Sequence, residues 1–381
     1  MSAPLIFCRD PGAARVLSSL KDILPAASQW VAKDAARGIL AEERIDHEDL
    51  NRTLGIHRGF TRDEDLAVLD AWWCSLPRPS LLLTGTTHHD DMTDRWLWDF
   101  ARRDGVGSLA VLDQWMRVRE RFEVAGERWY PDAVAALSDD GVRQIKQEHL
   151  IEGAAFAAPH PHLSRLLERR ERTLARRAAV RHDLVARVGS FQKLVVFASE
   201  PQKELHKAGA SFPGDPKDQA EIFSLLWQAF RAVAGPHDLL LMRPHPKEDP
   251  ASYAVHFDEK GHDRGPVLDG ARRAALWSAP MVPSMDLLAA ADSVIGVGSM
   301  FLLEALSMRR PVLSLEALVR SGENAMARWK DLVVRPTSWE GVSTFISKPP
   351  VLPEEAKLQQ ALGLSSKWRE KWKGVLDRRV T

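Results

Sequence analysis

Short apolar runs alternate with longer amphipathic segments along this chain. The runs predict buried strands, and the segments between them place apolar residues at helical spacing. Such an alternation is typical of a parallel sheet covered by helices. The expected strands are Leu5–Cys8, Leu81–Leu83, Ser108–Leu112, Lys193–Ala198, Asp238–Arg243, Ser293–Ile295 and Pro311–Leu315. Helices are expected over Thr93–Arg103, Asp218–Val233 and Met285–Ala291. Two further helices are expected to begin at Ala13 and at Ser299.

The alternation is interrupted once, by a connector over residues 159–188. Eight arginines fall within residues 165–187, with leucines at helical spacing, and this predicts an amphipathic helix with a solvated face. A face for an acidic partner or a membrane surface is the alternative. The predicted fold class is α/β, with two doubly wound Rossmann-like domains facing a cleft. The domains are expected at residues 1–188 and 189–352, followed by a helical tail at 353–381.

The most informative segment is 290–315, in which a strand runs into a tight turn and then a helix. Gly296 and Gly298 form the turn, and Ser299 is a good helix N-cap. Backbone N–H groups at such a turn favour a bound anion. We therefore expect Gly298 and Ser299 to contact a phosphate, and Glu304 to turn towards a bound sugar ring.

A second loop, Arg243-Pro244-His245-Pro246-Lys247, follows another expected strand directly. Its two prolines stiffen the loop and remove backbone donors, which leaves the Arg243, His245 and Lys247 side chains to make contacts. A histidine held there can donate to a phosphate or, as a second role, move a proton. The alternative interpretation is that this loop is a plain surface turn. The loop lies at the end of a strand, and this favours the interpretation that it binds a ligand.

Composition narrows the function classes. Lys plus Arg equals Asp plus Glu, 52 each, so the formal net charge is zero, which argues against a nucleic-acid binder that works through bulk charge. Two cysteines, Cys8 and Cys74, make neither a disulfide framework nor a zinc cluster. The N-terminal apolar run is too short for a signal peptide, and no stretch approaches the ~20 apolar residues of a membrane span. We therefore expect a cytoplasmic protein.

Taken together, the loops of the C-terminal half resemble the donor domain of GT-B glycosyltransferases. More narrowly, they are similar to bacterial sialyltransferase, polysialyltransferase and capsule-type transferase families, which carry a His-Pro motif and a serine-rich turn with a downstream Glu. His245-Pro246, Gly298-Ser299 and Glu304 match over about residues 190–320, and Ser199-Glu200-Pro201 resembles the first donor-domain loop. The resemblance implies a CMP-, UDP- or CDP-linked sugar as substrate and no cofactor. It places His245 and Ser299 on the phosphate and Glu304 on the ribose or base.

The N-terminal half has loops of its own at or beyond expected strand ends. Asp10-Pro11-Gly12, Thr84-Gly85-Thr86-Thr87 and Leu112-Asp113-Gln114-Trp115 are similar to segments of a group of bacterial polysaccharide-biosynthesis proteins. This chain departs from that group at Gln114, where the group often has His. An arginine cluster follows, and because arginine matches carboxylate and phosphate geometry, it suits an anionic acceptor. Its members are Arg117, Arg119 and Arg121.

Glycosyl transfer with inversion needs a base for the acceptor hydroxyl. The candidates are Asp10, Asp113 and the histidines His88 and His89, with Asp10 and Asp113 ranked highest. The alternative role of Asp10 is that of a helix N-cap or an Asx-turn residue, and the alternative role of Asp113 is that of a structural partner of Arg117. The acidic motif that supplies the base in sialyltransferases is matched as a string by Asp139-Asp140-Gly141, but we expect this string to follow a helix rather than a strand end.

The leading hypothesis is therefore a metal-independent, inverting glycosyltransferase of polysaccharide biosynthesis that acts on a glycan or glycoconjugate acceptor. The string His88-His89-Asp90-Asp91 contains metal-binding residue types, but adjacent ligands point apart in an extended loop, so we expect no metal site. A sugar-nucleotide 2-epimerase and a CDP-alditol phosphotransferase are the enzymatic alternatives. A nucleotide-binding scaffold protein is the non-enzymatic one. By analogy with GT-B proteins, the 353–381 tail is expected to pack on the first domain.

Overall fold

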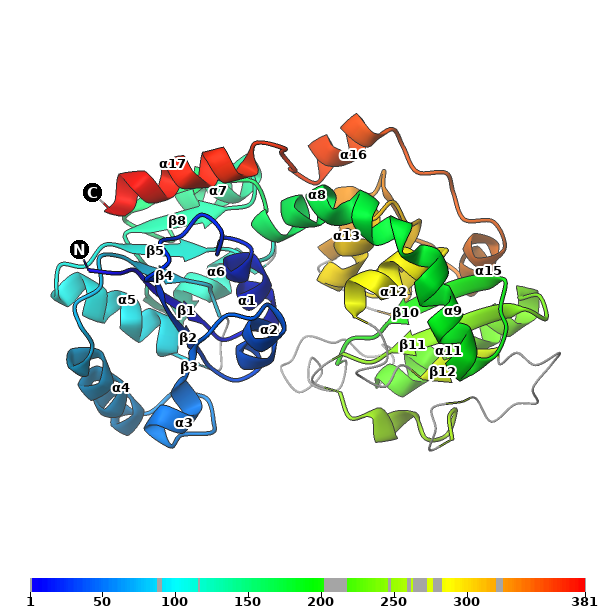
Figure 1. The fold of residues 1–381 in the computed structure, drawn as a ribbon, viewed down its shortest axis with the longest axis horizontal. Helices are drawn as coiled ribbons and strands as arrows, with labels where there is room; N and C mark the ends of the chain where they lie inside the picture. The colour runs from blue at the N-terminus through cyan, green and yellow to red at the C-terminus, as the bar shows by residue number, and fades with distance from the viewer. Residues whose placement is uncertain are drawn as a thin grey trace. The chain divides into compact units, whose positions relative to one another are not determined.

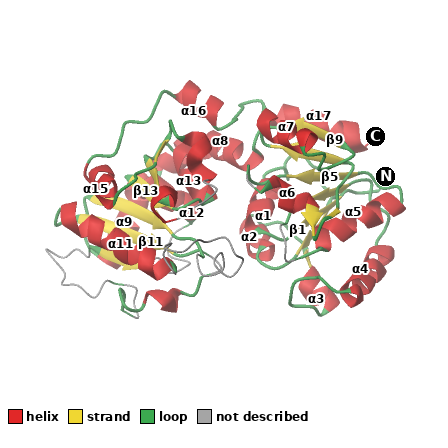
Figure 2. Ribbon diagram, turned by 180° about the vertical axis from the view of Figure 1, so that it is seen from behind, coloured by secondary structure: helices red, strands yellow, loops and turns green. Residues whose placement is uncertain are grey.

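The computed structural model describes residues 2–87, 91–115, 117–201, 218–245, 248–258, 262, 273–276, 283–319 and 325–380. The chain divides into two compact units (Figures 1 and 2). Unit 1 comprises Met1–Arg165 and Gly363–Thr381, and unit 2 comprises Leu166–Leu362. Each unit is an α/β layer structure, as the sequence pattern predicts.

Unit 1 is built on a parallel sheet of order β3-β2-β1-β4-β5-β8-β9. Its strands are β1 (Leu5–Cys8), β2 (Gln29–Ala32), β3 (Glu48–Asp49), β4 (Leu82–Thr84), β5 (Ser108–Val111), β8 (Ala133–Ala136) and β9 (Ala154–Ala157), with a small hairpin of β6 (Glu123–Val124) and β7 (Glu127–Arg128). Its helices are α1 (Pro11–Ser18), α2 (Ala36–Glu42), α3 (Leu50–Leu54), α4 (Asp63–Ser75), α5 (Thr93–Arg103), α6 (Val118–Phe122), α7 (Asp139–Gln147) and α17 (Trp368–Val380).

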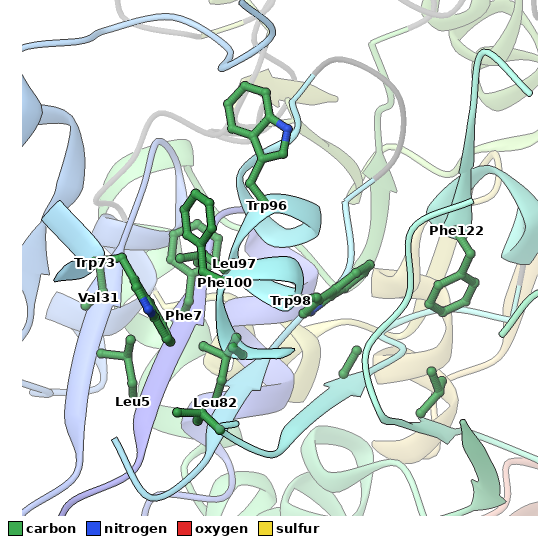
Figure 3. Close-up of a cluster of buried hydrophobic side chains, with 14 of the residues drawn as sticks. Leu5, Phe7, Val31, Trp73, Leu82, Trp96, Leu97, Trp98, Phe100 and Phe122 are labelled. Atoms are coloured by element: carbon green, nitrogen blue, oxygen red, sulfur yellow. The ribbon is translucent and has the colours of Figure 1, made fainter. Parts of the chain in front are cut away.

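The central strands β1, β4, β5 and β8 are buried along their whole length, and their successive side chains point to opposite faces of the sheet. Leu5 and Phe7 of β1 join a core with tryptophans of α4 and α5, among them Trp73 and Trp98 (Figure 3). Ile6 and Cys8 of the same strand join the opposite core, with residues of α1, α2 and α17. The strands therefore read as continuous apolar runs, which is why the sequence marks several of them clearly.

Unit 2 repeats the design with a parallel sheet of order β12-β11-β10-β13-β14-β15. Its strands are β10 (Lys193–Ala198), β11 (Asp238–Arg243), β12 (Ala274–Leu276), β13 (Ser293–Gly296), β14 (Val312–Ser314) and β15 (Val333–Val334). Its helices are α9 (Arg177–Val188), α11 (Gln219–Val233), α12 (Ser284–Ala290), α13 (Met300–Ser307), α14 (Glu316–Val319), α15 (Trp339–Ser347) and α16 (Glu355–Ala361), with 3₁₀ turns η1 (Pro250–Tyr253) and η2 (Ala325–Trp329).

The boundary between the units falls within helix α8 (Pro161–Ala175), whereas the sequence analysis placed it at 188/189. Arginines of the connector account for this difference. Arg177 and Arg181 both reach Asp292 of unit 2, at 2.6 and 3.1 Å, and each also donates to backbone carbonyls beside it. Arg170 pairs with Glu355 at 2.9 Å. The expectation of a solvated arginine face is wrong for these residues, because they fasten α8 and α9 to unit 2.

The tail expected at 353–381 is divided between the units. Helix α16 belongs to unit 2, and α17 belongs to unit 1. Trp368 and Trp372 of α17 are fully buried in the core beside α1 and α2, and Trp372 Nε1 donates to the Pro159 carbonyl at 2.8 Å. The tryptophans are the residues that fix α17 on unit 1. No helix in the described part of the chain is long and apolar enough to cross a membrane.

The acidic string Asp139-Asp140-Gly141 corrects another expectation. It opens α7 directly after strand β8, with Ser138 as the N-cap, so it lies at a strand end and does not follow a helix. Alanine-rich sequence of β8 suggests a helix by propensity. Its residues are instead buried between β5 and β9, where burial decides the structure. Asp139 and Asp140 are exposed, and Asp140 pairs with Arg143 on the same helix turn.

Candidate functional site

In unit 2, the loops singled out by the sequence meet at one edge of the sheet. All strands are parallel, so their carboxyl ends share that edge. Strands β10 and β13 are neighbours, with Ala198 opposite Gly296, although β11 and β12 follow β10 in the chain on its other side. The order of the strands thus reverses between β10 and β13. Open α/β sheets bind ligands at such a reversal point.

The glycine turn after β13 is tightly packed and already holds an anionic group. A Cβ atom on Gly296, the last residue of β13, would lie 3.1 Å from the Ala198 carbonyl oxygen, which is a tight contact. Ser299 is the N-cap of α13, and its hydroxyl accepts from the Phe301 N–H at 3.2 Å. The Gly298 N–H donates to a Glu200 carboxylate oxygen at 2.6 Å. The structure confirms Ser299 as N-cap and shows that the Gly298 N–H binds a carboxylate.

Arg243 brings a positive charge to the start of α13. It is the last residue of β11, and its guanidinium lies 4.2 Å from the centre of the Phe301 ring. A guanidinium N–H also donates to the Ser284 hydroxyl at 3.3 Å, at the first residue of α12. A cation in this place and the helix start together favour a phosphate. Arg243 therefore fits the ligand-binding role that its sequence position predicts.

Ser199 has a different environment from the one expected of a ligand contact. Its side chain is 1% exposed, and its hydroxyl donates to Glu248 at 2.8 Å and bonds to the Tyr253 hydroxyl at 2.9 Å. The other Glu248 oxygen accepts from the His245 N–H at 2.6 Å. Burial raises the pKa of the Glu248 carboxyl. Ser199 and the His245 N–H thus bind the same carboxyl group, that of Glu248, a residue for which the sequence offered no signal.

The structure describes the remaining residues of the predicted nucleotide-sugar site only in part. His245 begins the turn that Glu248 closes, and Pro246 and Lys247 lie outside the described residues. Glu304 is buried on α13, the helix that starts at the glycine turn. Its role as a ribose or base contact stays a prediction.

In unit 1, the corresponding reversal of strand order lies between β1 and β4. Two glycines let the first turn of α1 pack against the ends of the neighbouring strands. A Cβ atom on Gly85, after β4, would lie 2.2 Å from Ala13 Cβ. A Cβ atom on Gly12 would lie 2.0 Å from the Asp113 Oδ2 atom, after β5. The loops of β1, β4 and β5 are therefore in direct contact at this edge.

Asp10 stands at the start of α1. Its backbone has the extended conformation of an N-cap residue, and its carbonyl accepts the Ala14 N–H at 2.9 Å. Its side chain makes no capping hydrogen bond. The half-buried Asp10 thus occupies the N-cap position that the alternative predicts, although its carboxylate makes no capping hydrogen bond.

Asp113 is held in a buried ion pair. Its Oδ1 atom accepts from Arg121 at 2.7 Å, and both side chains are 3% exposed. Arg121 also donates to the Thr86 carbonyl at 3.0 Å. The partner expected for Asp113 was Arg117, and this is wrong: Arg117 precedes α6, and Arg121 lies one turn into it. With one oxygen on Arg121 and the other against Gly12, Asp113 is better suited to fixing the loops than to taking a proton.

The string His88-His89-Asp90-Asp91 lies only partly in the described structure, because His88, His89 and Asp90 are outside it. Asp91 is fully buried and bound to the Lys33 ammonium group. Its two oxygens also accept the N–H groups of Phe60 and Thr93, each at 2.9 Å. Among the residues that the structure describes, no group of metal-ligating side chains is present. Asp91 is therefore held by an internal ion pair and two backbone N–H groups.

Asp94 is a titratable group that the sequence analysis missed. It lies in the first turn of α5, is 1% exposed, and accepts a hydrogen bond from the Thr87 hydroxyl at 3.0 Å. Burial and the Asp91 carboxylate raise its pKa to about 7, against the opposing effect of Arg95, and the Asp10 carboxylate adds a smaller increase. Carboxyl groups with such a pKa cluster at functional sites.

We expect Asp94 to make the stability of the protein depend on pH. The folded state binds its proton more tightly than the unfolded chain does, so the stabilisation is complete below about pH 4 and is lost as the pH rises through about 7. The free energy of unfolding should fall by up to about 1.4 kcal/mol per pH unit in that window. Urea unfolding of wild type and Asp94→Asn from pH 4 to 8 measures this. Parallel curves for the two proteins would contradict it.

No protein-family model matches the sequence, and no curated protein matches it. Solved structures do match. UDP-GlcNAc 2-epimerase from Neisseria meningitidis, bound to UDP-GlcNAc, aligns at 12% identity over 99% of this chain and 100% of that chain, with a TM-score of 0.61. The 2-epimerase from Methanocaldococcus jannaschii aligns at 10% identity over 99% of both chains, with a TM-score of 0.63. The wall teichoic acid polymerase TagF aligns at 10% identity over 99% of this chain and 89% of that chain, with a TM-score of 0.52.

These likenesses confirm the predicted fold class of two Rossmann-like units, the GT-B type. Identities of 10–12% show the fold alone. The narrower resemblance to sialyltransferase and capsule-type families stays a prediction.

Proposed function

We propose that this protein is a nucleotide-sugar-dependent glycosyltransferase, in which unit 2 binds the donor and unit 1 supplies the base. The observation that carries the proposal is the edge of unit 2 where strand order reverses. There the Arg243 guanidinium, the Gly298 N–H and the N-terminus of α13 come together. This combination of a cation, a glycine-turn amide and a helix start suits the phosphate groups of a nucleotide. Solved structures of this fold whose titles name UDP-GlcNAc support the choice of ligand class.

The proposed reaction is a direct displacement. The acceptor hydroxyl oxygen bonds to the anomeric carbon, and the bond from that carbon to the phosphate oxygen breaks, with its electron pair leaving on the phosphate. Asp10 takes the hydroxyl proton, and Arg243 stabilises the negative charge that develops on the leaving nucleotide. A single displacement of this kind inverts the configuration at the anomeric carbon of the sugar. We propose a glycan or glycoconjugate acceptor. An anionic acceptor that uses the exposed Arg119 has to compete with Glu123 and Glu148, which pair with it at 3.5 and 2.9 Å.

Arg243→Gln is expected to weaken the binding of UDP or CDP by about 10- to 100-fold, because a hydrogen bond to a charged group contributes about 1.5–3 kcal/mol. Isothermal titration calorimetry with UDP, CDP, CMP and GDP measures the affinity and identifies the nucleotide. Arg231→Gln is the matched control, since Arg231 is an exposed residue of α11 in the same unit. Equal affinities of the two variants for every nucleotide would rule out the proposed phosphate site.

A sugar-nucleotide 2-epimerase is the second candidate. One observation favours it: the two solved 2-epimerases align with TM-scores of 0.61 and 0.63, against 0.52 for TagF. Incubation with UDP-GlcNAc alone separates the two functions. An epimerase changes the configuration at C2 of the sugar without an acceptor, which proton NMR detects. A transferase consumes the donor only when an acceptor is present. A CDP-alditol phosphotransferase would instead consume a CDP-alditol when that compound replaces UDP-GlcNAc in the incubation.

A further inference from the structure

The Gly298 N–H is occupied in the protein itself. Glu200 lies two residues beyond the end of β10, and Gly298 lies two residues beyond the end of β13. Because these strands are paired neighbours, the Glu200 side chain spans from one loop to the other, and its Oε1 atom accepts the Gly298 N–H at 2.6 Å. A carboxylate therefore binds the amide that the proposed function assigns to a donor phosphate.

Ser199, the residue before Glu200, is held firmly. Ser199 is buried and bonded to Glu248 and Tyr253 at 2.8 and 2.9 Å, and its N–H donates to the Arg243 carbonyl at 2.9 Å. The backbone before Glu200 thus has little freedom, whereas a glutamate side chain can turn about its own torsions. The Glu200 carboxylate is able to leave the Gly298 N–H without moving the strand.

A carboxylate and a phosphate cannot share this amide. One N–H makes one strong hydrogen bond, and two anions placed side by side repel each other. Ser299 already satisfies the Phe301 N–H at the same helix start. A phosphate that uses the Gly298 amide must first displace Glu200.

We propose, building on the donor site of the proposed function, that Glu200 is an internal competitor that determines which anions bind there. A ligand has to make enough other contacts to offset the loss of the Glu200–Gly298 hydrogen bond. A nucleoside diphosphate has a base, a ribose and two phosphates with which to do so. Inorganic phosphate lacks the base, the ribose and the second phosphate, so Glu200 excludes it.

Titration calorimetry of wild type, Glu200→Gln and Glu200→Ala with UDP, CDP and inorganic phosphate tests this proposal. Removing the carboxylate should raise phosphate affinity by about tenfold or more, as expected for loss of a competing hydrogen bond from a charged group. UDP or CDP affinity should rise as well, and Glu200→Gln should lie between the other two proteins. Glu340→Gln is the matched control, because Glu340 is an exposed glutamate of α15 in the same unit and its replacement removes the same charge.

The possible results separate the two proposals. Weaker binding by Glu200→Ala would make Glu200 a ligand contact, and unchanged binding would show that it does not compete; either overturns this inference and leaves the donor site standing. Absence of binding by every variant overturns both. A spectrum with ¹⁵N-labelled glycine gives a readout free of nucleotide: the Gly298 amide proton should shift upfield in both Glu200 variants. An unshifted signal in variants whose thermal unfolding matches that of wild type would contradict the proposal.

Discussion

Asp10→Asn is expected to lower kcat by about 10²- to 10⁴-fold and to leave the affinity for the donor nucleotide unchanged. General base catalysis contributes rate factors of this size, and asparagine cannot accept the proton. The fold should survive the change, because the Asp10 side chain makes no capping hydrogen bond to α1. The measurement is turnover of the nucleotide sugar found by calorimetry, with acceptor present. Full turnover by Asp10→Asn would remove Asp10 as the base.

Asp218 is a matched control for Asp10. It is also the N-cap of a helix, α11, but its carboxylate does cap, accepting the Glu221 N–H at 3.0 Å. Asp218→Ala should therefore reduce the free energy of unfolding by about 0.5–2 kcal/mol and leave kcat unchanged. Asp10→Ala should show the opposite pattern, with a small loss of stability and a large loss of turnover. If both variants lose stability and turnover alike, Asp10 is a structural residue.

Much of the fold could be predicted because the strands that matter are buried on both faces. Lys193–Ala198 and Asp238–Arg243 are confirmed as strands residue for residue, and Thr93–Arg103 as a helix. Each is an uninterrupted apolar or amphipathic pattern with a polar boundary. The pattern fails where length or composition misleads. Strand β2 at Gln29–Ala32 is short and half exposed at its start, and the alanines of β8 suggest a helix.

The candidate site could be predicted only as far as its loops. Strand ends in a parallel sheet share one edge, so the positions of Arg243, Gly298 and Ser299 follow from topology. Hydrogen-bond partners do not follow from topology, because they depend on side chains far away in the sequence. Glu200 finds the Gly298 amide, and Ser199 finds Glu248. The spacing of residues along the sequence does not predict these hydrogen-bond pairs. The raised pKa of Asp94 likewise results from tertiary packing, which the sequence pattern does not show.

Lys33 and Asp91 form a buried ion pair in unit 1. Both side chains are fully buried. The Lys33 ammonium group also donates to the Arg58 carbonyl at 3.2 Å and lies 4.3 Å from the centre of the Phe60 ring. Asp91 in turn binds the N–H of Thr93, the first residue of α5. The pair therefore anchors the loop that leads to Asp94, and its carboxylate is one cause of the raised pKa of Asp94.

Asp91→Ala should reduce the free energy of unfolding by up to about 3–5 kcal/mol, because it removes the nearest carboxylate from the buried Lys33 charge and leaves the part-exposed Asp34 carboxylate at 3.5 Å. The double variant Lys33→Met/Asp91→Leu should lose less than Asp91→Ala, since it removes both charges and fills the space with apolar atoms. Glu64→Ala is the control: Glu64 pairs with Arg62 at 3.0 Å on the surface, and such pairs contribute about 0–1 kcal/mol. Urea unfolding of the four proteins measures these differences. A loss in Asp91→Ala no greater than in Glu64→Ala would mean that the pair does not stabilise the start of α5.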